Sequence, residues 1–161
     1  MKEDFLKELE FLGLTARLKR LSDNLSYSIK ELYKVEAVDI EPSWHLVFLI
    51  LLKEEEVTMT EIADALRFSQ PAMTKMITRM KNKGYVDLVN SEKDNRKKII
   101  KLTKRARDEM PRFERIWDAG QKSIREILES NMDFFSSLEE FENQIKIKSF
   151  KVRALEKLND D

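Results

Sequence analysis

Residues 58–85, TMTEIADALRFSQPAMTKMITRMKNKGY, decide the fold that this sequence predicts. Thr58 and Glu61 have the spacing of a capping box, in which each residue satisfies a free backbone donor at a helix start. Ser69 is a good N-cap for a second helix, and Pro71 falls in its first turn, where a missing N–H costs little. Two short helices joined by a tight turn predict a helix-turn-helix motif.

A two-stranded wing is predicted directly after this motif. Gly84 ends the second helix. Residues 85–89 and 98–102 are rich in Val, Ile, Leu and Tyr and are predicted to be strands. The loop between them, NSEKDNRK at 90–97, is polar and basic. We therefore expect a winged helix-turn-helix over residues 42–103, and we expect this region to bind DNA.

Long helices are predicted on both sides of the winged region. Apolar residues recur at helical spacing over residues 3–34, and a last helix is expected over 134–158. A further helix from Thr103 to about Glu129 contains Pro111, which predicts a kink or a late start. The segment SWHLVFLILLKEE, opened by Pro42, is apolar nearly all round and should form the centre of the core.

The fold class predicted is therefore mainly α with a small β wing. We expect one domain over residues 1–161, in which residues 1–34 and 104–161 are dimerisation helices. With few Gly and Pro and 42% hydrophobic residues, the chain should be globular. It has no apolar run of about 20 residues, no signal-peptide-like apolar segment and no Cys, so we expect a cytoplasmic protein without disulfides.

Basic charge is concentrated in one quarter of a chain whose formal net charge is zero. Residues 67–107 contain 13 Lys/Arg and 3 Asp/Glu, a net charge of +10, whereas residues 1–66 and 108–161 carry −6 and −4. This asymmetry indicates a surface for a polyanion. The alternative is an ordinary solvated face.

One face of the second helix has the composition of a DNA-recognition surface. Four apolar residues share the inward side: Met73, Met76, Ile77 and Met80. The opposite side is short-chained and polar, which allows close approach to base edges in the major groove. An ordinary exposed face would show Glu/Lys ladders, but residues 69–83 contain no acid. The predicted DNA contacts on this helix are Ser69, Gln70, Pro71, Thr74, Lys75 and Thr78.

The tip of the wing is predicted to supply further DNA contacts. An Arg on a narrow loop can enter the minor groove, which suits Arg96. Asp94 lies two residues earlier, and because phosphate repels a carboxylate, we expect it to hold this arginine or to cap the turn. Both roles can hold together. The predicted wing contacts are Lys93, Asp94, Arg96, Lys97 and Lys98.

These motifs resemble those of the multiple-antibiotic-resistance regulator (MarR) family of winged-helix transcription factors. The matching residues are Glu61-Ile62-Ala63, Leu66, Ser69, Thr74, Gly84-Tyr85-Val86, the Asp94-x-Arg96 pair and Leu102-Thr103. The sequence departs from the family pattern at Arg67, where Gly or Asn is frequent, and at Asn95, where a second Arg is common. The resemblance implies a homodimer on a pseudo-palindromic operator, acting as a repressor that a small ligand releases.

The sequence favours a dimer independently of the resemblance. The terminal helices carry wide apolar stripes, and Phe134, Phe135, Phe141 and Phe150 are many aromatic residues for a final helix. A second copy of the chain would cover them. Packing within one chain is the alternative. A two-fold dimer would place two recognition helices roughly 34 Å apart, one turn of DNA.

A small-molecule pocket is a weaker prediction. Tyr33, Trp44 and His45 could border a pocket where the dimerisation helices meet the winged region, which is where members of the resembled family often bind ligands. His45 is the only histidine, and a core residue with a hydrogen bond is the alternative role for it. Nothing around it supplies a metal-ligand set, so we expect neither metal nor cofactor.

Two other classes of function compete with DNA binding. A winged helix that binds protein instead of DNA is the main alternative, because one fold serves both uses. Its outward helix face should be apolar or acidic, and this face is neither. An enzyme is not expected, because the sequence has no nucleophile–base pair, no phosphate-binding glycine loop and no metal cluster.

Overall fold

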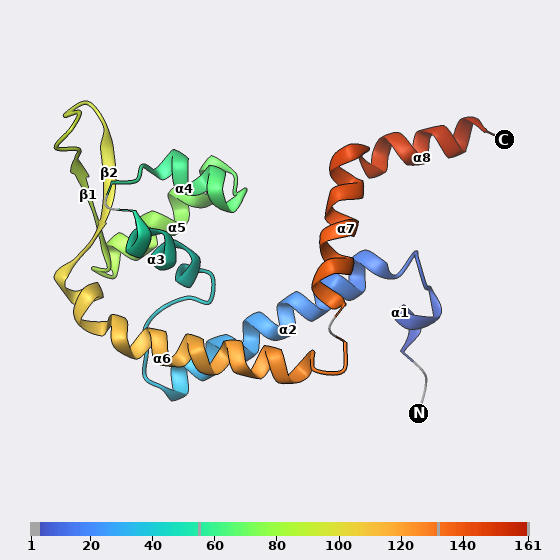
Figure 1. Cartoon of the computed structure of the whole chain (residues 1–161), viewed down its shortest axis with the longest axis horizontal. Helices are drawn as coiled ribbons and strands as arrows, with labels where there is room; N and C mark the ends of the chain where they lie inside the picture. Colours follow the sequence, from blue (N-terminus) through green and yellow to red (C-terminus); the bar gives the residue numbers. More distant parts are fainter. Residues whose placement is uncertain (1–3, 55, 132, 161) are drawn as a thin grey trace. The chain divides into compact units, whose positions relative to one another are not determined.

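The computed structural model describes residues 4–54, 56–131 and 133–160, and it is mainly helical (Figure 1). The elements in chain order are α1 (Phe5–Glu8), α2 (Leu14–Val35), α3 (Trp44–Lys53), α4 (Met59–Leu66), α5 (Gln70–Asn82), β1 (Val86–Asn90), β2 (Lys98–Leu102), α6 (Lys104–Ile127), α7 (Phe134–Ile147) and α8 (Phe150–Asn159). The chain divides into two units, Met1–Arg115 and Ile116–Asp161, and the boundary falls inside α6. None of the described helices is long and apolar enough to cross a membrane.

The first unit contains the winged helix-turn-helix that the sequence predicts. Strands β1 and β2 form an antiparallel pair, with Val86 opposite Leu102 and Asn90 opposite Lys98. A third backbone segment joins them, because the N–H of Ile100 donates to the carbonyl of Val57 at 2.9 Å. The strands lie within one residue of their predicted bounds, so the predicted fold class is confirmed.

Aromatic side chains form the centre of this unit. Tyr85 is fully buried, and its ring centroid lies 6.0, 5.8 and 5.8 Å from those of Trp44, Phe48 and Phe113. Edge-on contacts of this kind add about 0.5–1.5 kcal/mol per pair to the burial of the rings. Tyr85, which follows the turn at the end of α5, therefore joins α3 to α6. Helix α3 contributes Trp44, Val47 and Phe48 to the core, but Leu49 and Leu52 are exposed, so it is buried on one side and not all round as predicted.

The prediction of one continuous helix over residues 3–34 is wrong, because the structure has two helices there, α1 and α2. Residue 3 lies outside the described part of the chain. The chain turns between α1 and α2, and Glu10 there has a positive φ of 45°. Gly13 lies against the backbone carbonyl of Leu6, where a Cβ would have no room. The glycine therefore permits a close backbone approach before α2.

Two further helix predictions need correction. The last helix is split, because Lys148 adopts an extended conformation and the Ser149 side chain accepts a hydrogen bond from Val152 N to begin α8. Ser at an N-cap stabilises such a new start. Helix α6 begins at Lys104 and continues through Pro111, so the alternative prediction that the helix begins only at Pro111 is wrong.

The second unit exposes many apolar side chains. Helices α7 and α8 bury none of their described residues. The large hydrophobic residues exposed on these two helices are Phe135, Phe141, Ile145, Ile147, Phe150, Val152, Leu155 and Leu158. So many exposed large apolar side chains on two helices are typical of an interaction surface.

Three helix C-termini in the first unit share a backbone motif that places one residue in the left-handed region. The φ angles are 50° at Ala37, 53° at Arg67 and 75° at Gly84. In each case the next N–H donates to the carbonyl five residues back, at 2.8–3.0 Å: Val38 to Tyr33, Phe68 to Ala63 and Tyr85 to Met80. Only Gly84 enters this region without a Cβ penalty.

We expect Arg67→Gly and Ala37→Gly each to raise the free energy of unfolding by about 0.5–1 kcal/mol, because glycine relieves the left-handed backbone. Gly84→Ala is the matched reversal and should lower it by a similar amount. A Cβ at position 84 would meet nothing closer than Arg105 Nη1 at 3.9 Å, so the backbone alone sets its cost. Urea unfolding measures all three; a loss of stability on either glycine substitution would contradict the assignment.

Candidate nucleic-acid interface

The capping box at the start of α4 fixes the first helix of the motif. Thr58 Oγ1 accepts a hydrogen bond from Glu61 N at 3.2 Å, and Glu61 Oε2 accepts one from Thr58 N at 2.7 Å. Hydrogen bonds from the Thr58 backbone and side chain lower the pKa of Glu61, which keeps the carboxylate ionised at neutral pH. The reciprocal contact predicted from the sequence is therefore present.

Helix α5 presents two chemically different sides. Met73, Ile77 and Met80 are buried. The six predicted contacts on this helix and its N-cap are all exposed: Ser69, Gln70, Pro71, Thr74, Lys75 and Thr78. Ala72 N donates to the Ser69 side chain at 3.4 Å and Met73 N to the Ser69 carbonyl at 3.0 Å. Pro71 has no N–H, so Gln70 supplies the remaining first-turn N–H at the positive end of the helix dipole. This end favours an anion.

The threonine hydroxyls on the exposed side already use their protons within the protein. Thr78 Oγ1 donates to the carbonyl of Thr74 at 2.7 Å, and Thr74 Oγ1 lies 3.3 Å from Met59 Sδ. A hydroxyl has one donor and two acceptor positions. These two side chains therefore offer mainly acceptors to an incoming ligand.

The cations of α5 divide into free and paired groups. Lys75 has no ion-pair partner among the described residues. Arg79 Nη2 lies 2.6 Å from Glu41 Oε1, and Lys83 Nζ lies 2.5 Å from Asp39 Oδ2. Sequence reasoning missed these pairs because the partners lie 38 and 44 residues away. Lys81 likewise has no ion-pair partner among the described residues, so Lys75 and Lys81 are the two unpaired cations of this helix there.

The wing loop is ordered by its own aspartate. Asp94 Oδ1 accepts from both the backbone N and the side-chain Nε of Arg96, each at 3.1 Å. The Asp94 carbonyl accepts from Lys97 N at 2.8 Å and closes the turn. The Arg96 hydrogen bonds lower the pKa of Asp94, so the contact is present at neutral pH. Both roles predicted for Asp94, holding the arginine and capping the turn, are observed.

The remaining wing cations lie on the surface. Arg96 is 92% exposed despite its contact with Asp94, and its Nη1 is not used there. Lys97 and Lys98 are exposed and have no ion-pair partner in the described ranges. Lys93 is 81% exposed, with Glu56 at 3.9 Å. The wing thus offers four exposed cations beside one internally bonded carboxylate.

Sequence reasoning missed the polar residues that shape the wing from inside. Ser91 is buried and donates to Glu56 Oε2 at 3.0 Å, and the Glu56 side chain is only 17% exposed. Asn95, where the family pattern often has Arg, accepts from Asn90 Nδ2 at 2.8 Å. A Ser just after a strand is a common turn former, but its partner 35 residues earlier had no local signal.

The end of α5 is tied to α6 through Tyr85. The Arg105 guanidinium lies 4.4 Å from the Tyr85 ring centre and donates to its hydroxyl at 3.0 Å. Arg105 also donates to Lys83 O at 2.5 Å and to Glu109 at 2.8 Å. Burial, then the nearby Glu109 carboxylate, raises the pKa of Tyr85 to about 12. The phenol therefore stays neutral and rigidly held at physiological pH.

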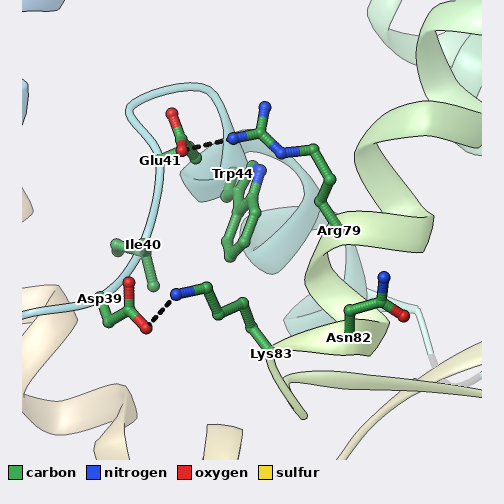
Figure 2. Close-up of a pocket in the computed structure, with 7 residues that line it drawn as sticks. All are labelled: Asp39, Ile40, Glu41, Trp44, Arg79, Asn82 and Lys83. Carbon is green, nitrogen blue, oxygen red and sulfur yellow. Dashed lines mark hydrogen bonds and ion pairs between the residues drawn. The ribbon is translucent and has the colours of Figure 1, made fainter.

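A pocket of about 210 Å³ lies between the start of α3 and the last turns of α5 (Figure 2). Figure 2 shows the two ion pairs of Arg79 and Lys83 with Trp44 drawn between them. The lining residues are Asp39, Ile40, Glu41, Trp44, Arg79, Asn82 and Lys83. Of the three predicted ligand contacts, Trp44 lines this pocket, whereas Tyr33 and His45 do not.

His45 has the contact expected of a core histidine. Its Nδ1 lies 2.6 Å from the carbonyl oxygen of Pro42, one turn earlier. Among the described residues, no group of three or more His, Cys, Asp or Glu side chains could hold a metal ion.

The helix-turn-helix and the two-stranded wing after it define a winged-helix fold. Residues 38–97 match the model of a family described as the MarR family. This match confirms, over that segment, the resemblance predicted from the sequence. No curated protein sequence is similar enough to the chain to count as a match.

Solved structures of transcription regulators share the fold. A MarR/EmrR family regulator from Acinetobacter sp. ADP1 is 18% identical, with a TM-score of 0.65 over 83% of this chain and 94% of that one. The transcriptional repressor CouR, bound to a 23-mer DNA duplex, is 24% identical, with a TM-score of 0.67 over 91% and 98%. A MarR variant from E. coli complexed with operator DNA is 22% identical, with a TM-score of 0.63 over 89% and 99%.

Proposed function

We propose that this protein is a sequence-specific transcription regulator that binds double-stranded DNA. The observation that carries the proposal is the exposed, acid-free side of α5 next to a wing with four exposed cations. The match to the MarR family supports it, as do similar folds solved with DNA. A protein-binding winged helix would be expected to expose an apolar or acidic helix side instead.

The two parts of this surface are assigned different roles. Short side chains and Lys75 on α5 contact base edges in the major groove, where the donor and acceptor pattern identifies each base pair. Lys97 and Lys98 contact phosphates, which hold the protein on any sequence. Arg96, held by Asp94, enters the adjacent minor groove, where narrow A·T-rich sequence deepens the negative potential.

We expect Lys75→Ala to relax sequence preference and Lys98→Ala to weaken binding to all duplexes alike. Lys75 contributes about 1–3 kcal/mol of discrimination if it contacts a base, whereas removal of one phosphate contact lowers the salt slope by about 0.9. Fluorescence anisotropy on the DNA upstream of the coding region and on a scrambled duplex, at two or more salt concentrations, measures both. Arg96→Ala should also weaken the binding.

Lys53→Ala is the matched control, because Lys53 is exposed, has no ion-pair partner among the described residues, and belongs neither to the proposed DNA contacts nor to the proposed dimerisation helices. Its affinity and salt slope should equal those of the wild type. Equal effects of Lys75→Ala and Lys98→Ala on every duplex would contradict the base contact assigned to Lys75 and the phosphate contact assigned to Lys98. An absence of salt-sensitive binding to either duplex would favour the protein-interaction module.

The proposal includes a homodimer on a pseudo-palindromic operator. The exposed apolar side chains of α7 and α8 support it, because a second copy would bury them. On this proposal residues 1–34 and 104–161 supply the dimerisation helices, and the chain acts as a repressor. A two-fold axis then presents the two copies of α5 to successive major grooves.

Phe141→Glu should shift the protein from dimer to monomer, because it places a charge within the proposed apolar interface. Sedimentation equilibrium at micromolar concentration measures the shift. Glu142→Gln alters an exposed neighbour on the same helix and should leave the dimer intact. A wild type that sediments as a monomer would remove the dimer from the proposal.

Release by a small effector is the last element of the proposal. The pocket beside Trp44 offers one aromatic wall and two cations from α5, which suits an aromatic acid. Such a ligand would compete with Asp39 and Glu41 for Lys83 and Arg79, and so act on the recognition helix.

An aromatic acid that fits this pocket should change Trp44 fluorescence and weaken DNA binding together, because one site carries both effects. A Trp117→Phe background leaves Trp44 as the only tryptophan, since the chain has two. Fluorescence titration with a panel of aromatic acids, repeated in the anisotropy assay, provides the measurement. If neither signal responds across the panel, effector release through this pocket is rejected.

A further inference from the structure

The first turn of the wing is built around one buried hydroxyl. Ser91 is 6% exposed. Its Oγ accepts hydrogen bonds from the backbone N of Lys93 at 3.1 Å and of Asp94 at 3.2 Å. The same hydroxyl donates a hydrogen bond to Glu56 Oε2 at 3.0 Å. This oxygen therefore uses its donor position and both acceptor positions, and each bond constrains the loop.

Glu56 reaches the wing from a firmly placed segment. It precedes Val57, whose carbonyl accepts from Ile100 N at 2.9 Å on strand β2. The Glu56 side chain is only 17% exposed. Because the backbone beside it is bonded to the sheet, its carboxylate has a defined position beneath the loop. Hydrogen bonds to an ionised acceptor are stronger than neutral ones.

The contacts of Glu56 continue to the tip of the wing. Ser91 holds the backbone N of Asp94, and Asp94 in turn holds both the backbone and the side chain of Arg96. Ser91 N also donates to Lys97 O at 2.9 Å, which closes the loop. A continuous series of hydrogen bonds therefore runs from Glu56 to the arginine assigned to the minor groove.

We infer that Glu56 is a positioning residue for DNA binding, which acts through Ser91 to hold the wing and its arginine in a binding geometry. This inference rests on the proposed function, because the wing needs a DNA partner to be positioned for. It assigns a role to an acidic residue that does not itself contact DNA. An unanchored wing would have to be ordered at the moment of binding, and that ordering costs affinity.

The change in DNA affinity on removal of the Glu56 side chain separates positioning from simple electrostatic repulsion. A carboxylate close to a polyanion repels it, so removing one should tighten DNA binding or leave it unchanged. Positioning predicts weaker binding when residue 56 can no longer accept the hydrogen bond from Ser91. Glu92 is the matched comparison: it lies on the same loop, is 85% exposed and has only Lys101 as an ion-pair partner among the described residues, at 3.6 Å.

The test compares Glu56→Ala, Glu56→Gln and Glu92→Ala by DNA anisotropy over a salt series. Glu56→Ala should weaken binding about three- to tenfold, the equivalent of one hydrogen bond, and should lower the salt slope by about 0.9 for each phosphate that the wing no longer reaches. Glu56→Gln keeps an oxygen that accepts from Ser91, so it should restore wild-type binding. Glu92→Ala should bind as tightly as the wild type or tighter.

Ser91→Ala completes the design through a double-mutant cycle. If Glu56 acts through Ser91, the combined variant loses no more affinity than Ser91→Ala alone. A general loss of folding would reduce the active fraction but leave the salt slope unchanged. Wild-type or tighter binding by Glu56→Ala, or no rescue by Glu56→Gln, overturns the inference.

Amide hydrogen exchange tests the anchor without DNA. The N–H groups of Lys93 and Asp94 donate to Ser91, so they should exchange faster in Glu56→Ala than in Glu92→Ala. Wild-type protein that binds no duplex would reject the proposed function alone, and faster exchange would still support the anchor. Unchanged exchange in Glu56→Ala would reject the anchor, whether or not the protein binds DNA.

Discussion

The burial of the Tyr85 ring is the interaction on which the rest of the winged unit depends. The ring lies directly after the left-handed turn at Gly84, so its position fixes where α5 ends and where β1 begins. It contacts aromatic rings of α3 and α6, and Arg105 covers its face and hydroxyl. The DNA-reading role proposed for α5 would need a rigid support, because a displacement of about 1 Å at a binding group is enough to spoil its geometry.

Positive charge on this unit is divided between structure and binding. Arg79 and Lys83 on α5 are paired with carboxylates of the 38–41 segment, while Lys75, Lys97 and Lys98 have no such partner among the described residues. Exposed pairs contribute only about 0–1 kcal/mol each, so they orient side chains more than they stabilise the fold. The unpaired cations keep their full charge for a ligand.

Local chemistry explains which parts of this structure could be predicted. The capping box at Thr58, the Asp94–Arg96 contact and both strands depend on residues close in sequence, and spacing alone is enough to find each of them. The break before α2 was missed because the apolar periodicity continues through it, and only the approach of Gly13 to the Leu6 carbonyl reveals it. The contact between Glu56 and Ser91 could not be predicted either, because its two partners are 35 residues apart and neither has a local pattern.

The same separation of charge has a consequence for how the protein behaves in solution. The formal net charge is zero at pH 7, yet residues 67–107 carry +10, and the balancing acids lie elsewhere in the chain. A molecule without net charge lacks the mutual repulsion that keeps proteins apart, and its basic surface attracts the acidic surfaces of other copies. We therefore expect solubility to be lowest near neutral pH and low ionic strength. Moderate salt should disperse the free protein, although it would weaken the proposed contacts with DNA phosphates.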